Sequence, residues 1–198
     1  MKRYSFFYGW LFFISGCVSF TAMGPGELSS SGLVVTTDIT WNQAPGEATR
    51  LSRPDSRTWT QDGFLLDRIL IIPAVPGGEP IFRQTSSSQA LPLFESTMLP
   101  NEIQELVESS IVKLFGEGGA AVETRRLRPQ SYGADNGIMF DVEVSLSDGP
   151  DYKGLTGALV VDEKLYLILY LAAEPYYFEK HVERATRVIK SARVSKPL

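Results

Sequence analysis

The side chains with the strongest potential for acid–base or metal chemistry are few in this sequence. His181 is the only histidine, which excludes a metal site built from several imidazoles. A histidine acting as catalytic base needs a nucleophile and an orienting acid, and no Gly-x-Ser-x-Gly turn is present to supply the nucleophile. His181 lies between Phe178 and Ala185 on a predicted helix. We interpret it as a residue at the boundary of that helix's buried face.

Two acidic side chains are the next candidates. Asp141 and Glu143 alternate along a predicted strand, so both project from one face, about 7 Å apart. That separation could suit the carboxylate pair of a glycosidase. Arg126 and Arg128, however, lie on one face of the preceding predicted strand, and an antiparallel hairpin would set them opposite the two acids. We predict structural ion pairs and keep the hydrolase as an alternative.

The sequence contains no pattern typical of a site for a metal ion, a cofactor or a nucleic acid. Asp148, Asp151 and Asp162 fall in predicted turns, but they lack the dense ligand spacing of a calcium loop. The chain has a formal net charge of −4, whereas nucleic-acid binding requires a clustered basic surface. The sequence therefore predicts no metal, no cofactor, no nucleic-acid partner and no catalytic residue, which indicates a protein other than an enzyme.

Aromatic residues offer a possible contact surface. The segment from Gln84 to Met98 is polar at first and then apolar, and structureless loops of this length in compact domains often have a role. Aromatic anchors within a polar rim are typical of binding hot spots, so Trp59 and Phe94 are our candidates for contact with a partner or ligand. In the alternative interpretation, Leu93 and Phe94 are buried and only fix the loop to the core.

The N-terminal residues predict where in the cell the protein is located. Lys2 and Arg3 precede an apolar run from Phe6 to Ile14, which is the architecture of a signal peptide. This run is too short to span a bilayer, because a transmembrane helix needs roughly 20 apolar residues. The only cysteine, Cys17, follows directly after two small residues.

The tetrapeptide Ile14-Ser15-Gly16-Cys17 resembles the lipobox of bacterial lipoproteins. The resemblance implies cleavage between Gly16 and Cys17 and attachment of lipid to the Cys17 thiol, and two or more acyl chains anchor a protein firmly. Val18 stands where an aspartate would favour the inner membrane, so the resemblance implies an outer-membrane lipoprotein facing the periplasm. The alternative is an ordinary secretory signal or N-terminal anchor with a chance cysteine.

The rest of the chain predicts a single domain over residues 33–194, after a signal peptide (1–16) and a lipidated, flexible tether (17–32) rich in Gly, Pro and Ser. Apolar residues at helical spacing predict helices over about 100–116 and 175–192. About six strands complete the domain, including a C-terminal meander at 122–128, 138–146, 155–161 and 165–172. These elements predict an α+β fold, a twisted antiparallel sheet covered by two helices.

The order helix, meander, helix resembles the second half of the α/β/α sandwich of Mog1- and PsbP-type proteins. Segments 58–63, 98–102, 165–168 and 174–178 also resemble a group of uncharacterised bacterial lipoproteins, a resemblance that implies a fold and an address but no activity. We therefore expect a non-enzymatic, membrane-anchored binding module with an envelope protein as partner. A periplasmic carrier of a small apolar ligand or lipid is the alternative, and a hydrolase is the third class.

Overall fold

The computed structural model describes residues 19–46, 53–84, 90–116 and 118–195. Gly16 and Cys17, at which cleavage and lipidation are predicted, lie outside the described residues, as do positions 85–89 of the predicted contact loop. Among the helices that are described, none is both long and apolar enough to cross a membrane.

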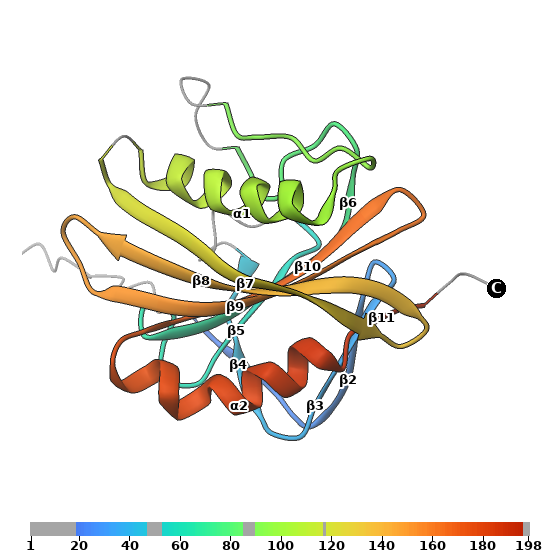
Figure 1. Ribbon diagram of the computed structural model, residues 1–198. Coiled ribbons are helices and arrows are strands. Elements are labelled where there is room, and N and C mark those ends of the chain that lie inside the picture. The colour runs from blue at the N-terminus through green and yellow to red at the C-terminus, as the bar shows by residue number, and fades with distance from the viewer. Residues whose placement is uncertain (1–18, 47–52, 85–89, 117, 196–198) are drawn as a thin grey trace, which may run out of the picture.

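An eight-stranded antiparallel sheet forms the centre of the molecule (Figure 1). In their order across the sheet, the strands are β1 (Thr21–Met23), β4 (Trp41–Gln43), β5 (Arg57–Thr60), β6 (Asp67–Pro76), β10 (Lys164–Ala173), β9 (Asp151–Val161), β8 (Asp135–Leu146) and β7 (Ala120–Tyr132). Strand β10 lies between β6 and β9 and is buried on both faces, as its nearly continuous apolar sequence predicts.

A smaller sheet of three strands packs beside the first. Its order is β11 (Arg193–Val194), β3 (Leu33–Thr37) and β2 (Gly26–Ser30). Strand β11 follows the last helix directly and pairs with β3 through Arg193 and Val34. This pairing joins the C-terminal end of the described chain to its N-terminal strands.

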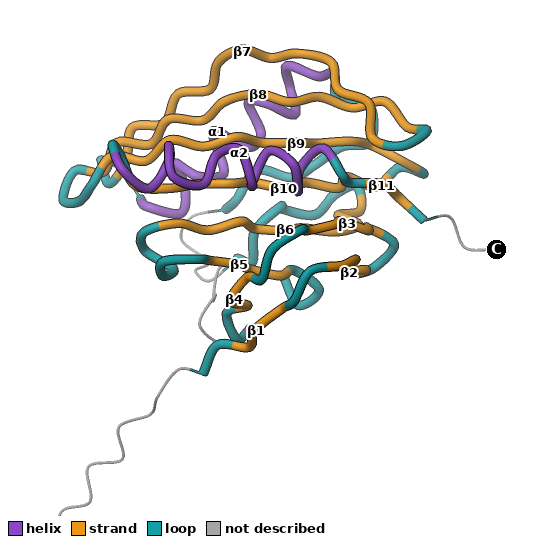
Figure 2. Tube along the Cα trace, turned by 90° about the horizontal axis from the view of Figure 1, so that it is seen from below, coloured by secondary structure: helices purple, strands orange, loops and turns teal. Residues whose placement is uncertain are grey.

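Two helices cover opposite faces of the large sheet, α1 (Pro100–Phe115) on one and α2 (Tyr176–Lys190) on the other (Figures 1 and 2). Pro100 begins α1, where its missing N–H costs nothing, and the Glu102 carboxylate accepts a hydrogen bond from the Leu99 N–H (2.6 Å). Gly157 lets α2 approach β9, since a Cβ at this glycine would lie 2.5 Å from Cγ2 of Ile189.

Each helix closes its own hydrophobic core. The α1 side contains Ile103, Leu106, Val107 and Ile111 packed with Phe140, Val142, Leu167 and Leu169. The α2 side contains Ala185, Val188 and Ile189 packed with Ile69, Ile71, Ile168 and Tyr170, and β3 adds Leu33 and Val35 to it.

The predicted α+β fold with about six strands is wrong. The described chain is mostly antiparallel β-structure, with eleven strands in two sheets and only two helices. Strands β1 and β2 occupy residues 21–23 and 26–30, where a flexible tether is predicted. Their composition favours an open chain, but each gains a ladder partner further along the sequence, β4 for β1 and β3 for β2. Both helices lie within two residues of their predicted ranges.

Candidate functional site

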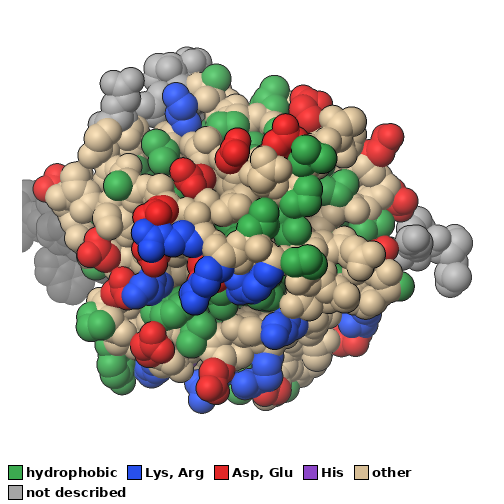
Figure 3. Space-filling view, in the orientation of Figure 1, with side chains coloured by type: hydrophobic (Ala, Val, Ile, Leu, Met, Phe, Trp, Pro, Cys, Tyr) green, Lys and Arg blue, Asp and Glu red, His purple; other side chains and the backbone are tan. Residues whose placement is uncertain are grey.

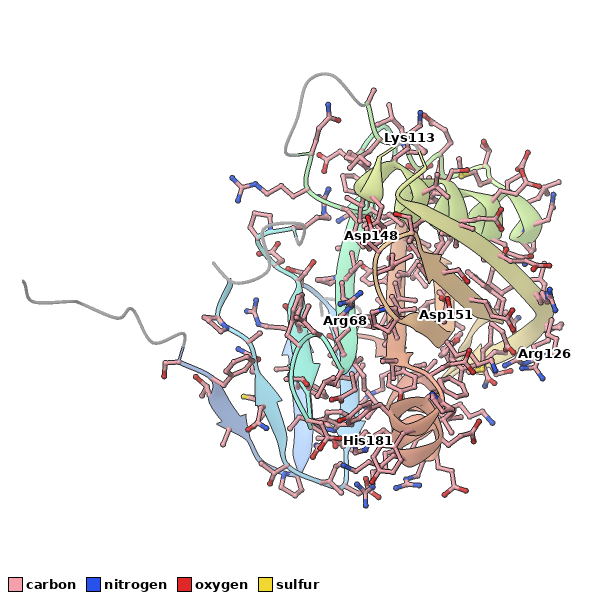
Figure 4. The ribbon with its side chains drawn as sticks, turned by 90° about the vertical axis from the view of Figure 1, so that its left-hand side faces the viewer. Arg68, Lys113, Arg126, Asp148, Asp151 and His181 are labelled. Carbon is pink, nitrogen blue, oxygen red and sulfur yellow. The ribbon has the colours of Figure 1, made fainter. Side chains whose placement is uncertain are left out.

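Two charged clusters flank helix α2, and each combines one aspartate with two cationic or basic side chains. The first, the Asp62 cluster, contains Asp62, Lys180 and His181. The second surrounds Asp141, which contacts Arg126 and Arg128. In Figure 4 the labelled His181 lies on α2, whereas Arg126 lies well away from His181, on the outer strand of the sheet.

The turn between β5 and β6 positions Asp62. Gly63 has a φ of 127°, a conformation that favours glycine, and the turn is held by the buried carboxylate of Asp67. This carboxylate accepts hydrogen bonds from Thr60 Oγ1 (3.0 Å) and from the backbone N–H groups of Gln61 (2.9 Å) and Asp62 (2.7 Å). The Asp62 side chain thereby points at α2.

Asp62 binds both basic groups of the helix. Its Oδ2 lies 2.7 Å from Lys180 Nζ and 2.6 Å from His181 Nε2. Burial by itself would raise the pKa of the Asp62 carboxyl, but hydrogen bonds and positive charge from Lys180 and His181 outweigh it and hold the pKa below its usual value. His181 is 2% exposed, so the predicted boundary residue lies within the packed face of α2.

The donor set around Asp62 could in principle hold a metal, because ligand atoms of Asp62, Asp67 and His181 lie within 4.8 Å of one another. Their existing contacts argue against it. Asp67 already accepts three hydrogen bonds, and the Lys180 ammonium occupies the side of Asp62 that a cation would approach. The Asp62 cluster therefore acts as a link between the β5–β6 turn and α2.

A β-bulge shapes the second cluster. Strands β7 and β8 pair in regular register up to Arg125 opposite Asp141, and the register then shifts before Arg128. Arg126 lies in this bulge with a φ of 55°. This left-handed backbone conformation is strained for arginine, because the Cβ atom approaches the following carbonyl oxygen. The bulge turns Arg126 outward, and its side chain is 77% exposed.

Asp141 receives both guanidinium groups. Arg126 Nη2 donates to Asp141 Oδ2, and Arg128 Nη1 donates to Asp141 Oδ1 at 3.0 Å. Two cations thus share one carboxylate, which leaves a local surplus of positive charge. Loss of hydration and repulsion by Arg126 together lower the pKa of the Arg128 guanidinium from its usual value.

Two adjoining hollows surround this arrangement, and together they form what we call the Asp141 groove. One, of about 380 Å³, is lined by Arg126, Arg128, Asp141, Leu155, Phe178 and Val182. The other, of about 460 Å³, is lined by Glu123, Arg125, Arg126, Asp141, Glu143 and Lys153. Figure 3 shows Lys and Arg side chains gathered in a band across the middle of the molecule, with acidic side chains between them.

The other sequence candidates for catalysis are only partly brought together. Asp141 and Glu143 both line the larger hollow. Arg126 and Arg128 both contact Asp141, as the sequence predicts. Neither has a described contact with Glu143, however, and the residue directly opposite Asp141 is Arg125. Glu143 lies opposite Glu123 on β7 and Lys153 on β9. His181 contacts Asp62 instead, and no described contact joins it to either acid, so the three side chains do not form one cleft.

The two aromatic contact candidates lie inside the protein. Trp59 is 1% exposed and stacks on Trp41 with ring centroids 6.2 Å apart. Phe94 is 0% exposed and belongs to the α1-side core, while Leu93 is half-exposed. The hydrogen bond from Phe94 N to Glu79 O (2.9 Å) ties the loop down. Neither ring therefore offers surface to a partner, and Phe94 fits the alternative in which it fixes the loop.

Sequence reasoning missed Asp62 and Lys180 in the first cluster and the β-bulge in the second. In the sequence, Asp62-Gly63 indicates only a tight turn. One helix residue that Asp62 contacts, His181, lies 119 positions further along the chain. The sequence shows Arg126 and Arg128 as a pair on one face, because a regular strand alternates its side chains. It does not show the bulge between Arg125 and Arg128, which interrupts that alternation. The only available signal is the run of three arginines within four residues on an edge strand.

Arg68 is another cation with an unusual setting. Its Nη1 donates to Phe64 O (3.3 Å), and its guanidinium lies over the rings of Phe64 (5.2 Å) and Tyr152 (5.4 Å). Loss of hydration lowers the pKa of Arg68 from its usual value. Aromatic faces partly compensate a cation in this position, which makes Arg68 a packing residue.

Comparison with known proteins identifies the fold. No known protein-family model matches the chain, and no curated protein matches it in sequence. Among solved structures, the chain is similar to cyanobacterial PsbP (CyanoP) from Synechocystis sp. PCC 6803, with a TM-score of 0.56. The similarity covers 91% of this chain and 95% of that chain at 11% sequence identity. The chain therefore has a distant PsbP-like fold.

Proposed function

We propose that this protein is a lipid-anchored, non-enzymatic binding module of the bacterial cell envelope. Its anchor would be Cys17, and its domain would face the periplasm from the outer membrane. The pattern Ile14-Ser15-Gly16-Cys17 behind a short apolar run supports the anchor and the address. The Asp141 groove supports the binding role.

One observation carries the binding proposal: Arg126 is held in a strained bulge with its side chain 77% exposed. Backbone strain of this kind costs about 1–3 kcal/mol and occurs preferentially at functional positions. The Arg126 end of its ion pair with Asp141 is exposed to solvent, and Arg128 also pairs with the buried Asp141 carboxylate, so the contribution of Arg126 returns little of that energy. Contact with a partner gives the exposed guanidinium a role that the isolated fold does not.

A carrier of a small apolar ligand is the second candidate function. The smaller hollow of the Asp141 groove lies between the sheet and α2, and Leu155, Phe178 and Val182 give it an apolar wall. A hydrolase has less support, since His181 makes no described contact with Asp141 or Glu143. Mass spectrometry of the purified protein separates the first two, because a carrier co-purifies with lipid and a protein-binding module does not.

Anchoring is tested by radiolabelled palmitate and membrane fractionation. The natural chain should incorporate label and sediment with the outer membrane. Cys17→Ser should remain unlabelled as a soluble or uncleaved precursor, because no other thiol is available. Unchanged labelling of the Cys17→Ser protein would contradict the proposed anchor.

Binding is tested by crosslinking in cells followed by mass spectrometry. A partner that is recovered reproducibly with the natural chain should be lost with Arg126→Glu. The matched control is Lys113→Glu, which reverses an exposed cation on α1, on the opposite side of the sheet. Equal recovery with both variants would remove the Asp141 groove from the binding role.

A further inference from the structure

The bulge at Arg126 needs an explanation beyond protection of the sheet edge. Strand β7 is an edge of the large sheet, and bulges and charges on edge strands prevent aggregation. A glycine would form the same bulge without strain and an asparagine with less strain than arginine, so edge protection does not require an arginine there. What an arginine at position 126 contributes, and a glycine would not, is a guanidinium group exposed at the groove.

The two guanidinium groups have hydrogen-bonding capacity to spare. Each arginine carries five N–H donors. Among the described residues, Arg126 donates from Nη2 to Asp141, and Arg128 donates from Nη1 to Asp141 and to the Arg126 carbonyl oxygen (2.7 Å). The remaining nitrogens of both side chains have no described acceptor. A second carboxylate would use these donors in paired, charge-assisted hydrogen bonds.

An apolar wall lies directly beside these donors. Leu155 of β9 and Phe178 and Val182 of α2 line the same hollow as Arg126 and Arg128. A ligand that fills this hollow of about 380 Å³ therefore carries its carboxylate close to an apolar group. The terminal residue of a peptide meets this requirement, since its carboxylate and its side chain share one Cα.

The adjoining hollow distinguishes a peptide from an acyl chain. It is lined by both acids and bases, among them Glu123, Arg125 and Lys153. The backbone amides and carbonyls of preceding residues can form hydrogen bonds with such a surface. A hydrocarbon chain would instead have to displace water from charged groups without compensation.

We infer that the Asp141 groove binds the free C-terminus of a peptide whose last side chain is apolar, with Arg126 and Arg128 as the carboxylate receptors. This inference rests on the proposed binding function and names the chemistry of the ligand. The carboxylate lies against the free guanidinium donors, the last side chain against Leu155, Phe178 and Val182, and the preceding residues along the larger hollow.

The test measures fluorescence anisotropy of a labelled hexapeptide, Gly-Ser-Gly-Ser-Ala-Phe, with the full-length chain. We expect saturable binding below about 1 mM, as a few good contacts provide. Amidation of the C-terminus should weaken binding about tenfold, the loss of one charge-assisted interaction, and replacement of the terminal Phe by Ser should weaken it similarly. Octanoate should compete poorly, because it lacks the peptide backbone.

Two variants complete the design, each checked for folding by circular dichroism. Arg126→Gln retains a polar side chain without the charge, and it should weaken binding about tenfold. Lys113→Gln removes a cation from α1 and should leave the affinity unchanged. Equal affinity for the acid and the amide, no effect of Arg126→Gln, or no saturable binding to the folded protein would overturn the inference.

The proposed function can survive that failure. Loss of a crosslinked partner on Arg126→Glu in cells, together with no peptide binding, would keep the binding module and reject the C-terminal ligand. Octanoate binding that depends on Arg126, without peptide binding, would also reject the peptide and would favour the carrier. Failure of the peptide assay and of the crosslinking assay together would reject both proposals.

Discussion

The Asp62 cluster and the Asp141 groove contain similar residue types but have different roles. Each sets one aspartate against two basic side chains, and each lies against α2. In the Asp62 cluster the histidine is buried at 2% exposure and the loop conformation is supplied by Gly63. In the Asp141 groove the aspartate is buried, one arginine is 77% exposed, and the strain falls on that arginine.

The difference shows which cluster serves the fold. The Asp62 cluster links a turn to a helix, with two short contacts of 2.6 and 2.7 Å to a single oxygen. The Asp141 groove leaves guanidinium donors free, and its backbone strain falls on Arg126, whose solvent-exposed end of the ion pair returns little stability to the fold. Damage to the first should reduce stability, whereas damage to the second should reduce binding.

The largest effect is expected where β5 leads into the Asp62 turn. Trp59→Ala should lower the free energy of unfolding by about 3–5 kcal/mol, since it opens a cavity beside Trp41 in the core. Urea denaturation followed by circular dichroism measures the change. Trp59→Phe is the control and should cost much less, because Trp59 Nε1 has no described hydrogen-bond partner to lose. A nearly neutral Trp59→Ala would contradict its place in the core.

A smaller loss is expected at the Asp62 cluster itself. Asp62→Asn should lower the free energy of unfolding by about 1–2 kcal/mol, because the buried His181 loses a charged partner while the exposed Lys180 contact is screened. Binding of the hexapeptide should be unchanged in the folded variant. A loss of peptide affinity without a loss of stability would invert the assigned roles.

This loss should depend on pH. The pKa of Asp62 is lowered from 3.8 in the folded state, so its stabilising contribution is fully present above pH 3.8 and disappears as the pH falls through the folded pKa. Below the pH range in which a histidine ordinarily titrates, the difference in unfolding free energy between the natural chain and Asp62→Asn should therefore shrink as the pH falls further. Urea titrations from about pH 5 downward measure it, and a difference that grows over that range would contradict the ion pair.

The smallest expected effect is an increase in the free energy of unfolding, at Arg126. Arg126→Gly should raise the free energy of unfolding by about 0.5 kcal/mol, because glycine accepts a φ of 55° without strain. Arg125→Gly, in the regular part of the same strand, should lower it by about 0.5–1 kcal/mol. Thermal denaturation of the two variants measures this contrast. A clear loss of stability in Arg126→Gly would assign Arg126 to the fold.

The sequence predicts best those features that depend on neighbouring residues. Helical spacing from Ile103 to Ile111 places α1, and the near-continuous apolar run from Leu165 to Leu171 places the central strand. Strands β1 and β2 escape prediction because Gly, Pro and Ser favour an open chain locally, and their hydrogen bonds depend on partners that sequence spacing does not identify.

The candidate sites show the same limit. Cross-strand pairing of Asp141 with arginines follows from the order of two adjacent strands, but the bulge that exposes Arg126 depends on side-chain and backbone fit along the edge. The partner of the buried His181 is Asp62, which lies in a turn 119 positions away in the sequence, so spacing along the chain does not reveal the contact. Trp59 and Phe94 look like contact residues because a large aromatic ring suits a core and an interface equally well.

The central claim is that the groove side of α2 meets the partner and the Asp62 side does not. Phe178 lines the groove, while the Tyr176 ring, two residues earlier, lies 5.6 Å from Lys180 Nζ. A photo-reactive phenylalanine analogue at either position keeps an aromatic ring on the same helix. We predict that light captures the partner in cells from position 178 only, and that Arg126→Glu abolishes the product. Equal capture from position 176, or capture from 178 that survives Arg126→Glu, would contradict the account.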